Sequence, residues 1–429
     1  MTSTPDTHTS PARSSTSSTA GAREGFLDRI GLPSSLKWGF LGLLVFMIGD
    51  GIELGYLAPY LQSQGIGEGQ VALLFTVYGI TVAIASWLSG PMSQVYGPRR
   101  VMWVGLAIWG VLEVAFLTVG IGAMNVPMML LTYALRGFGY PLFAYGFLVW
   151  IAAATPARRL GMAASWFWFA YAAGLPTLGS LVASLAIPRI GTMGTLWLSL
   201  VLVVVGGGLA LMAMAGVRGG GPLARPGASP FAAMASSISI MWREPISTVG
   251  GLVRTVNTSS QYAFFIVLPA FFMDVIGFSL EQWLQLLTVM FLGNLAGNLL
   301  SGWIGGRIGL RNTIALMGAL GTAAGILALY YVPQMAPGSF LVASVVAVVY
   351  GVMLGGYVPL SALMPMVLPQ DKAGALAVVS LGAGAATWVG PIVVAAVQPL
   401  WGLEGVMWTF AVLYVLSGAL VMLVREPRV

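Results

Sequence analysis

The stretch Leu300-Ser-Gly-Trp-Ile-Gly-Gly-Arg-Ile-Gly-Leu-Arg-Asn312 partly repeats Leu88-Ser-Gly-Pro-Met-Ser-Gln-Val-Tyr-Gly-Pro-Arg-Arg100, which lies 212 residues earlier. Each copy follows a long apolar segment and carries glycine and arginine at matching positions. The same offset relates Gln70 to Gln282, and each of these residues begins the apolar segment before its copy. The chain therefore contains an internal repeat, and repeated halves are typical of membrane transport proteins.

The composition places the chain in a lipid bilayer. Charged residues make up 7% of the sequence and hydrophobic residues 58%, whereas soluble proteins contain roughly 25% charged residues. The chain has no cysteine, and its one histidine is His8 in a polar N-terminal segment. These counts exclude thiolate and histidine-rich metal sites, disulfides and histidine-based catalysis. We expect no cofactor and no metal.

Apolar segments long enough to cross a bilayer, about 20 residues each, recur twelve times after Trp38. They predict an all-α membrane protein with twelve transmembrane helices in two pseudo-symmetric six-helix bundles. The predicted spans are 38–61, 70–92, 101–123, 127–153, 162–186, 193–216, 247–272, 282–304, 312–333, 338–367, 374–398 and 403–424.

Polar segments divide the chain further. Residues 1–37 are rich in Ser, Thr and Pro and predict a disordered tail. Residues 217–246 are rich in Gly and Pro and predict a linker. The bundles would then cover 38–216 and 247–424, with a short tail at 425–429.

The basic residues predict the orientation. Under this topology 16 of the 19 Lys and Arg residues lie on one side, and only Arg189 lies on the other. Arg136 and Arg254 fall inside spans. Since positive loops stay in the cytoplasm, we expect both termini there and the protein in the inner (plasma) membrane. The net charge of +6 reflects this topology, and no nucleic-acid partner is expected.

The repeated loops follow the pattern Gly-x4-basic-x-Gly-x-basic and resemble the signature loop of the major facilitator superfamily. The resemblance implies that these loops gate the transport cycle. The first copy departs from the pattern at Gln94 and Val95, and the second at Gly306. An alternative is that the glycines only allow a tight turn and the arginines only set topology. The candidate gating residues are Gly90, Gly97, Arg99, Arg100, Gly302, Arg307, Gly309 and Arg311.

Three stretches, 49–53, 135–143 and 253–258, are similar to the polyol permease family, which includes ribitol and arabinitol transporters. The resemblance implies transport of a small hydroxylated solute by alternating access. It also implies that an acid in the first span and an arginine in the fourth carry the proton coupling.

Ionisable residues at membrane depth are expensive and usually functional. Asp50, Glu53, Glu113 and Arg136 are such residues. Pairing of Arg136 with Asp50 or Glu113 is reasonable at their depths. We expect Asp50 to be the leading proton carrier, with Arg136 as its modulating partner and Glu113 as second candidate. The alternative is a fixed structural ion-pair network.

The seventh span carries a polar stripe, and aromatic residues of other spans lie at similar depth. Amides and hydroxyls suit a hydroxyl-rich ligand because they both donate and accept hydrogen bonds. The alternative for the asparagines is interhelical hydrogen bonding. The candidate solute-binding residues are Tyr56, Tyr140, Tyr145, Trp168, Arg254, Asn257, Thr258, Gln261, Asn294, Asn298, Tyr357 and Trp388.

The leading hypothesis is proton-coupled import of a polyol or sugar-like solute by a monomer. A carrier of a small carboxylate remains open, because a neutral polyol does not need Arg254 as a second buried cation. Drug–proton antiport also remains open, although Leu175 separates Gly174 from Pro176 where drug exporters carry a Gly-Pro motif. A membrane sensor or enzyme is the alternative from another class, but the chain shows no catalytic domain or phosphate loop.

Overall fold

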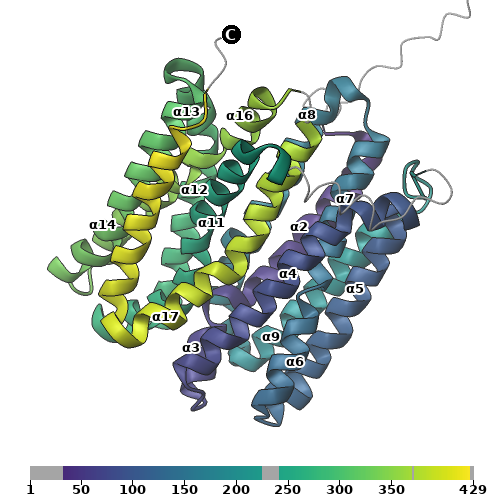
Figure 1. The fold of residues 1–429 in the computed structure, drawn as a ribbon. Helices are drawn as coiled ribbons and strands as arrows, with labels where there is room; N and C mark the ends of the chain where they lie inside the picture. The colour runs from purple at the N-terminus through teal and green to yellow at the C-terminus, as the bar shows by residue number, and fades with distance from the viewer. Residues whose placement is uncertain (1–31, 225–240, 370–371, 426–429) are drawn as a thin grey trace, which may run out of the picture.

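The computed structural model describes residues 32–224, 241–369 and 372–425, and within these ranges it contains helices and no strand. Figure 1 shows the helices as two side-by-side groups, one from each half of the chain. The predicted tail at 1–37 and linker at 217–246 lie largely outside the described residues. In the described part of the predicted tail, the first helix begins at Ser34. In the described part of the predicted linker, α11 begins at Pro245.

The N-terminal group begins with η1 and ends with α9. Its elements are η1 (Ser34–Leu36), α2 (Lys37–Gly51), η2 (Ile52–Gly55), α3 (Leu57–Ser63), α4 (Glu68–Tyr96), α5 (Pro98–Ala115), η3 (Phe116–Gly122), α6 (Val126–Arg136), α7 (Gly139–Ala154), α8 (Ala157–Ala172), η4 (Ala173–Leu178) and α9 (Gly179–Ala213).

The C-terminal group runs from α11 to α17. Its elements are α11 (Pro245–Ala270), η5 (Phe271–Val275), α12 (Leu280–Ile308), α13 (Leu310–Thr313), η6 (Ile314–Gly321), α14 (Thr322–Met335), α15 (Phe340–Leu354), η7 (Gly355–Tyr357), α16 (Leu360–Val367) and α17 (Lys372–Val421).

Glycines in the left-handed region divide the two longest apolar runs into pairs of spans. Nine helical runs of the described residues are long and apolar enough to cross a membrane, and two of them contain 52 and 47 residues. Non-helical glycines interrupt these runs at Gly191 (φ 73°) and Gly402 (φ 63°). Figure 1 shows α17 descending and then returning after its break. With the more polar α11, which is not among the nine, the two divided runs complete the predicted twelve crossings.

The internal repeat extends to the backbone. Gly97 and Gly309 share φ values of 92° and 90° between consecutive spans. Gln70 and Gln282 each accept a hydrogen bond from the backbone N–H three residues earlier, at the start of α4 and α12. These equivalent turns and caps make the two bundles pseudo-symmetric.

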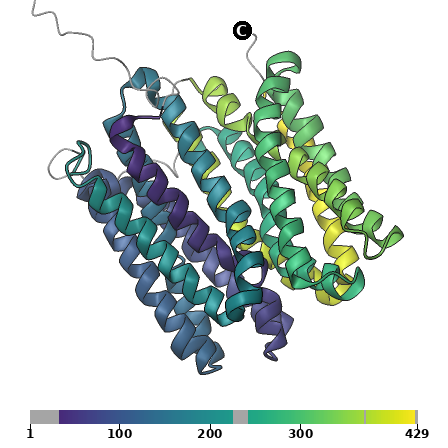
Figure 2. The same ribbon diagram turned by 180° about the vertical axis from the view of Figure 1, so that it is seen from behind.

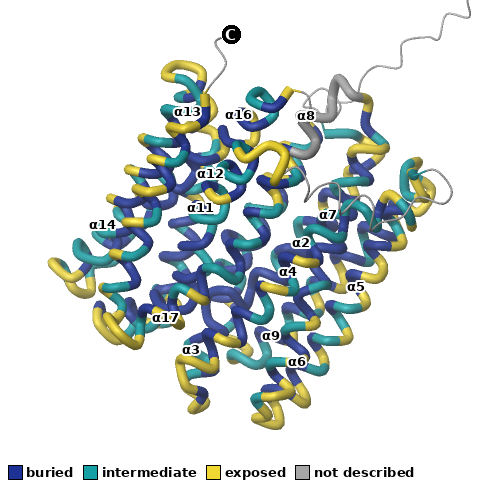
Figure 3. The backbone as a smooth tube through the Cα atoms, viewed as in Figure 1, coloured by how far each residue is buried: buried dark blue, intermediate teal, exposed yellow. Residues whose placement is uncertain are grey.

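The molecule is apolar outside as well as inside. Figure 3 shows exposed residues distributed over the outer helices, and among them Leu299, Leu341 and Met212 are more than 70% exposed. Such a surface is stable against lipid and not against water. Seen from behind in Figure 2, the same two groups of helices flank a common interface. The helices that meet there include α4 with α17, α9 with α12 and α3 with α11.

Candidate functional site

Arg136 is the centre of a buried charge cluster in the N-terminal bundle. Its side chain is fully buried and forms ion pairs with Glu53 of η2 and Glu113 of α5. The hydroxyl of Tyr133 donates to Glu53 at 3.0 Å. Glu113 is therefore one of the two partners of Arg136 that the depths of the residues in the membrane predicted. The pairing with Glu53 was not predicted.

Local helix breaks bring these groups together. The chain tightens into a 3-10 turn at Ile52–Gly55, and α6 ends at Arg136. Gly137 lets α4 approach, because a Cβ there would lie 2.8 Å from the carbonyl oxygen of Tyr78. The guanidinium carbon lies 4.5 and 4.9 Å from the ring centroids of Tyr133 and Trp109. Cation–π attraction therefore adds to the ion pairs.

Asp50 does not pair with Arg136. Its carboxylate accepts a 2.6 Å hydrogen bond from the indole N–H of Trp109, and it has no ion pair within the described part of the chain. The predicted partnership between Asp50 and Arg136 is therefore not a direct contact in this structure. Both acidic residues of the Arg136 cluster compete for the guanidinium, which leaves Asp50 as the excess carboxylate.

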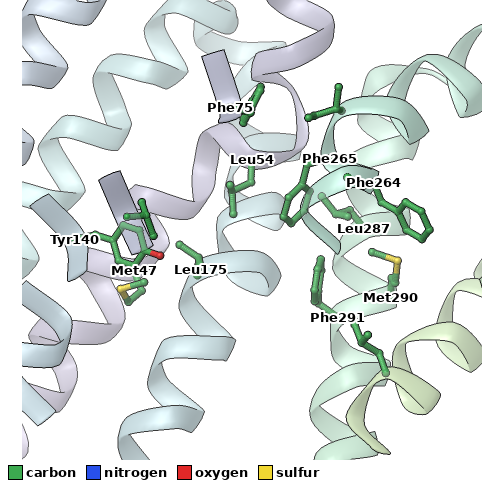
Figure 4. Close-up of a cluster of buried hydrophobic side chains, with 14 of the residues drawn as sticks. Met47, Leu54, Phe75, Tyr140, Leu175, Phe264, Phe265, Leu287, Met290 and Phe291 are labelled. Atoms are coloured by element: carbon green, nitrogen blue, oxygen red, sulfur yellow. The ribbon is translucent and has the colours of Figure 1, made fainter. Parts of the chain in front are cut away.

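Asp50 faces a cavity at the interface between the bundles. The cavity measures about 20 Å³, enough for about one water molecule, and both bundles line it. Tyr140 contributes from the first bundle, and Tyr262 and Thr387 contribute from the second. Figure 4 shows the apolar surroundings, including Leu54, Phe75 and Leu175 from one side and Phe264, Phe265 and Phe291 from the other.

The charge balance of this region favours proton binding. Three carboxylates (Asp50, Glu53 and Glu113) lie in the same bundle as one buried arginine, Arg136. Two uncompensated negative charges in a low-dielectric interior are costly, and a buried acid becomes neutral instead. The residue best placed to take up a proton from the interface is Asp50, because it borders the cavity.

Arg254 of α11 is the corresponding cation of the C-terminal bundle. It is half-buried, and its Nη1 donates to the Oδ1 of Asn257 at 3.0 Å. No carboxylate of the described residues pairs with it. The phenol groups of Tyr145 and Tyr171 in the other bundle, and of Tyr262 and Tyr414 in its own, lie within electrostatic range of the guanidinium. This environment offers a positive charge and hydroxyl groups to a ligand.

The structure brings several predicted aromatic residues together. The ring of Tyr145 lies 6.2 Å from Trp168 and 6.4 Å from Tyr171, and Tyr140 also lies 6.4 Å from Tyr171. Tyr171 was not among the predicted site residues. Its position three residues after Trp168 puts both on the same helix face, so the spacing could have indicated it.

Other predicted solute-binding residues make contacts within a bundle. The hydroxyl of Tyr56 donates to the carbonyl of Thr192 at 3.2 Å, and Tyr357 donates to Ser417 at 3.3 Å. Asn294 donates to the carbonyl of Gly351 at 3.3 Å, which is the interhelical alternative for this amide. The half-buried members of the predicted set are Tyr145, Arg254, Thr258, Gln261, Asn294, Asn298 and Trp388.

The first repeated loop binds the segment after α9. The backbone N–H of Arg99 donates to the carbonyl of Gly220 at 3.2 Å, and a Cβ on Gly97 would lie 2.7 Å from the carbonyl carbon of Gly221. In contrast, a Cβ on Gly90 or Gly302 would meet no atom within 4 Å.

The second loop has a different stabilising contact. The guanidinium of Arg307 lies 3.5 Å from the ring centroid of Trp303. Gly309 has the same left-handed backbone as Gly97. Arg100 is exposed and Arg311 half-buried. The two loops thus share their turn but not their side-chain contacts.

Hydrogen bonds among the described residues join the two bundles. Trp283 donates to the carbonyl of Gly55 at 2.7 Å, Thr387 to that of Gly79 at 2.8 Å, and Gln398 to Glu68 at 3.1 Å. Figure 1 places the C-terminus at one end of the bundles and α3 at the other. The bonds to Gly55 and Glu68 lie at the α3 end, so the bundles are joined there.

Comparison with known families agrees with this architecture. The model of the Major Facilitator Superfamily matches residues 39–288 and 250–429. The chain belongs to the major facilitator superfamily. It is a multi-pass membrane transporter rather than an enzyme, as the repeated loops and apolar spans indicated.

Curated relatives cover nearly the whole chain. It is 40% identical to an alpha-ketoglutarate permease of Bacillus subtilis, over 94% of this chain and 92% of the relative. It is 33% identical to a D-arabinitol transporter of Klebsiella pneumoniae, over 93% of this chain and 94% of the relative. The second match confirms the resemblance to polyol transporters.

A solved structure has the same fold. The crystal structure of a D-xylose-proton symporter superposes with a TM-score of 0.69, covering 94% of this chain and 98% of the other at 18% identity. At this identity the similarity establishes the superfamily fold and not the solute.

Proposed function

We propose that this transporter imports a small carboxylate together with protons. The observation that carries the proposal is Arg254, a half-buried guanidinium between the bundles with no carboxylate partner among the described residues. A charge at membrane depth is costly unless it is paired or wetted. A carboxylate solute supplies the missing partner, and arginine binds carboxylates through two parallel N–H donors.

The neighbouring hydroxyls fit the same ligand. Tyr145, Tyr171 and Tyr262 lie within electrostatic range of Arg254. A phenolic hydroxyl donates to a carboxylate and also accepts from a hydroxylated carbon chain. The site would therefore take a short carboxylate with a polar backbone.

Asp50 supplies the proton coupling in this proposal. Of the three buried carboxylates of the first bundle it is the one without an ion pair in the described residues, and it borders the cavity between the bundles. A proton bound there removes a negative charge while Arg254 takes up another with the solute. The proton offsets one carboxylate charge of the solute, so a carrier loaded with both carries no more charge from that carboxylate than the empty, deprotonated carrier, which lowers the cost of alternating access.

The same 16-to-1 distribution of basic residues supports cytoplasmic termini in the cell's inner membrane. With this orientation, the bonds from Trp283 to Gly55 and from Gln398 to Glu68 close the extracellular end. We therefore assign the α3 end to the outside and infer that this end is closed in the structure.

A polyol is the second candidate. The tyrosine hydroxyls and Gln261 suit a neutral pentitol, and the D-arabinitol transporter relative supports it. The alpha-ketoglutarate permease relative supports the carboxylate. The two candidates differ in charge, so Arg254 distinguishes them.

Reconstituted vesicles provide the test. Labelled 2-oxoglutarate uptake would be measured with unlabelled dicarboxylates, monocarboxylates and pentitols as competitors, under an inward proton gradient. We expect carboxylates to compete and Arg254→Gln to lower uptake at least tenfold. Arg189→Gln, at an exposed arginine on the other side, is the control. Competition by pentitols alone, with an unaffected Arg254→Gln variant, would exclude the carboxylate proposal.

A further inference from the structure

Both polar atoms of the Asn257 side chain are already used inside the protein. The residue is 4% exposed. Its Oδ1 accepts from Nη1 of Arg254 at 3.0 Å, and its Nδ2 donates to the carbonyl oxygen of Leu354 at 3.3 Å. An amide bound on both sides has little left to offer a solute. Its role follows instead from its hydrogen bond to Arg254.

The carbonyl of Leu354 lies where α15 ends and the helix tightens. In a continuous α-helix the N–H of Val358 would bind it. Here the N–H of Val358 donates to Gly355 at 3.2 Å, as the chain tightens into the 3-10 turn Gly355–Tyr357. In such a turn the carbonyl of Leu354 lies three residues before the N–H of Tyr357, and the amide of Asn257 binds this carbonyl as well, at 3.3 Å. Asn257 is thereby tied to a break in another helix.

The backbone around Asn257 is held as well. The hydroxyl of Tyr414 donates to the carbonyl of Asn257. Ser260 shares hydrogen bonds with Tyr414 at 2.7 Å and with Tyr350 at 2.8 Å. This network joins α11 to α15 and α17, so Asn257 has a fixed position and orientation.

The helix α17 restricts Arg254 from a second direction. A Cβ added to Gly382 would lie 3.2 Å from the Cβ of Arg254 and would also collide with the carbonyl of Gly251. The backbone of α17 is therefore in close contact with α11 at the base of the arginine. The side chain must leave α11 in the direction of Asn257.

We propose that Asn257 is a positioning residue that presets Arg254 for its ligand, and that it does not itself bind the solute. It engages one nitrogen of the guanidinium and leaves the other N–H groups to the ligand. The hydrogen bond from Asn257 to the carbonyl of Leu354 fixes the amide against α15, and the amide in turn fixes the guanidinium of Arg254. This inference rests on the proposed role of Arg254 as the anion-binding residue, and it assigns Asn257 to Arg254 rather than to the solute.

A matched pair of asparagines tests the inference. Asn294 also donates its amide to a carbonyl of α15, that of Gly351, at 3.3 Å. Its hydrogen bond has the same length and joins the same helix, but it has no described contact with Arg254. Asn257→Ala and Asn294→Ala therefore remove equivalent interhelical bonds, and only the first releases the arginine.

Two measurements on the protein distinguish positioning of Arg254 from simple hydrogen bonding between helices. In vesicles, we expect Asn257→Ala to raise the KM for 2-oxoglutarate about tenfold, as for loss of a charge-assisted hydrogen bond, with kcat little changed. In detergent, the arginine reagent phenylglyoxal should modify Arg254 several times faster in Asn257→Ala than in the unaltered protein, as read by peptide mass spectrometry. Asn294→Ala should leave the phenylglyoxal rate of Arg254 unchanged.

Asn257→Asp provides a second variant of nearly equal size. It keeps the acceptor for Arg254 but adds a negative charge, so we expect carboxylate uptake to fall further and phenylglyoxal modification to stay slow. Equal effects of Asn257→Ala and Asn294→Ala, or full carboxylate uptake by Asn257→Asp, would overturn the inference. The phenylglyoxal rate needs no solute. If the protein moves only pentitols, the proposed function fails while this rate still decides whether Asn257 positions Arg254.

Discussion

The indole N–H of Trp283 lies 2.7 Å from the carbonyl oxygen of Gly55, across the interface between the two bundles. The residue four positions after Gly55 is Pro59, which has no N–H to donate within the helix. The proline therefore leaves a carbonyl free at the end of the molecule that we assign to the outside. Trp283 occupies it when that end is closed.

Replacing Trp283 with Phe should favour the outward-open state. Phe keeps most of the apolar contact with Phe272, whose ring centroid lies 5.5 Å from that of Trp283, but it leaves the Gly55 carbonyl without its donor. Because the chain has no cysteine, Leu54→Cys gives a single reporter. We expect an impermeant maleimide added outside to label this reporter several times faster in Trp283→Phe.

The control for this prediction is Trp401→Phe. Trp401 is 67% exposed, so its loss should leave labelling of the Leu54→Cys reporter unchanged. Equal labelling rates in both tryptophan variants would show that the indole bond does not hold the closed end.

Replacing Asp50 with Asn should uncouple transport from protons. The amide preserves the size of the side chain but cannot bind and release a proton. We expect uptake by the unaltered protein to rise as the external pH falls, and the Asp50→Asn variant to lose both this dependence and accumulation against a gradient. Exchange of internal for external solute should persist. Glu281→Gln, at an exposed acid, is the control, and retained proton-driven accumulation by Asp50→Asn would refute the assignment.

Replacing Arg136 with Leu should destabilise the folded protein. The change leaves Glu53 and Glu113 buried without their cation, and breaking a buried pair in this way costs about 3–5 kcal/mol. Thermal unfolding followed by tryptophan fluorescence should show a clearly lower midpoint. Adding Glu53→Gln and Glu113→Gln to Arg136→Leu should restore part of the loss. An unchanged midpoint for Arg136→Leu alone would mean that the ion pairs contribute no net stability.

Replacing Gly97 with Ala should disturb the first repeated loop. Its φ of 92° is unfavourable for alanine by about 1–2 kcal/mol, and the new Cβ would collide with Gly221. We expect slower transport and a lower unfolding midpoint. Gly90→Ala is the matched control in the same motif, because its Cβ would meet nothing within 4 Å. Similar behaviour of the two variants would assign the effect to the motif as a whole rather than to the turn.

The number of crossings could be predicted because it depends on segment length. Apolar runs set the spans, and Gly191 and Gly402 mark breaks between spans that are otherwise continuous in helix. The capping residues Gln70 and Gln282 are also local, so the repeat in the sequence became a repeat in the structure.

The pairing of Arg136 with Glu53 could not be predicted because it depends on helix rotation. Depth alone allowed Asp50 or Glu113. The 3-10 turn at Ile52–Gly55 has three residues per turn instead of 3.6, which changes the direction of Glu53 relative to Asp50. An α-helical projection does not contain this change, and the indole of Trp109 then takes the place beside Asp50.

The two bundles carry different kinds of chemistry. The first contains the acids Asp50, Glu53 and Glu113, and the second contains the network of Arg254 and Asn257. In the proposed mechanism, proton coupling by Asp50 and solute binding by Arg254 therefore reside in different bundles. Mutations in α11, α15 and α17 could then change the transported solute while the proton-coupling residues of the first bundle stay the same. Chimeras that exchange only the second half between relatives should therefore exchange their solute specificity.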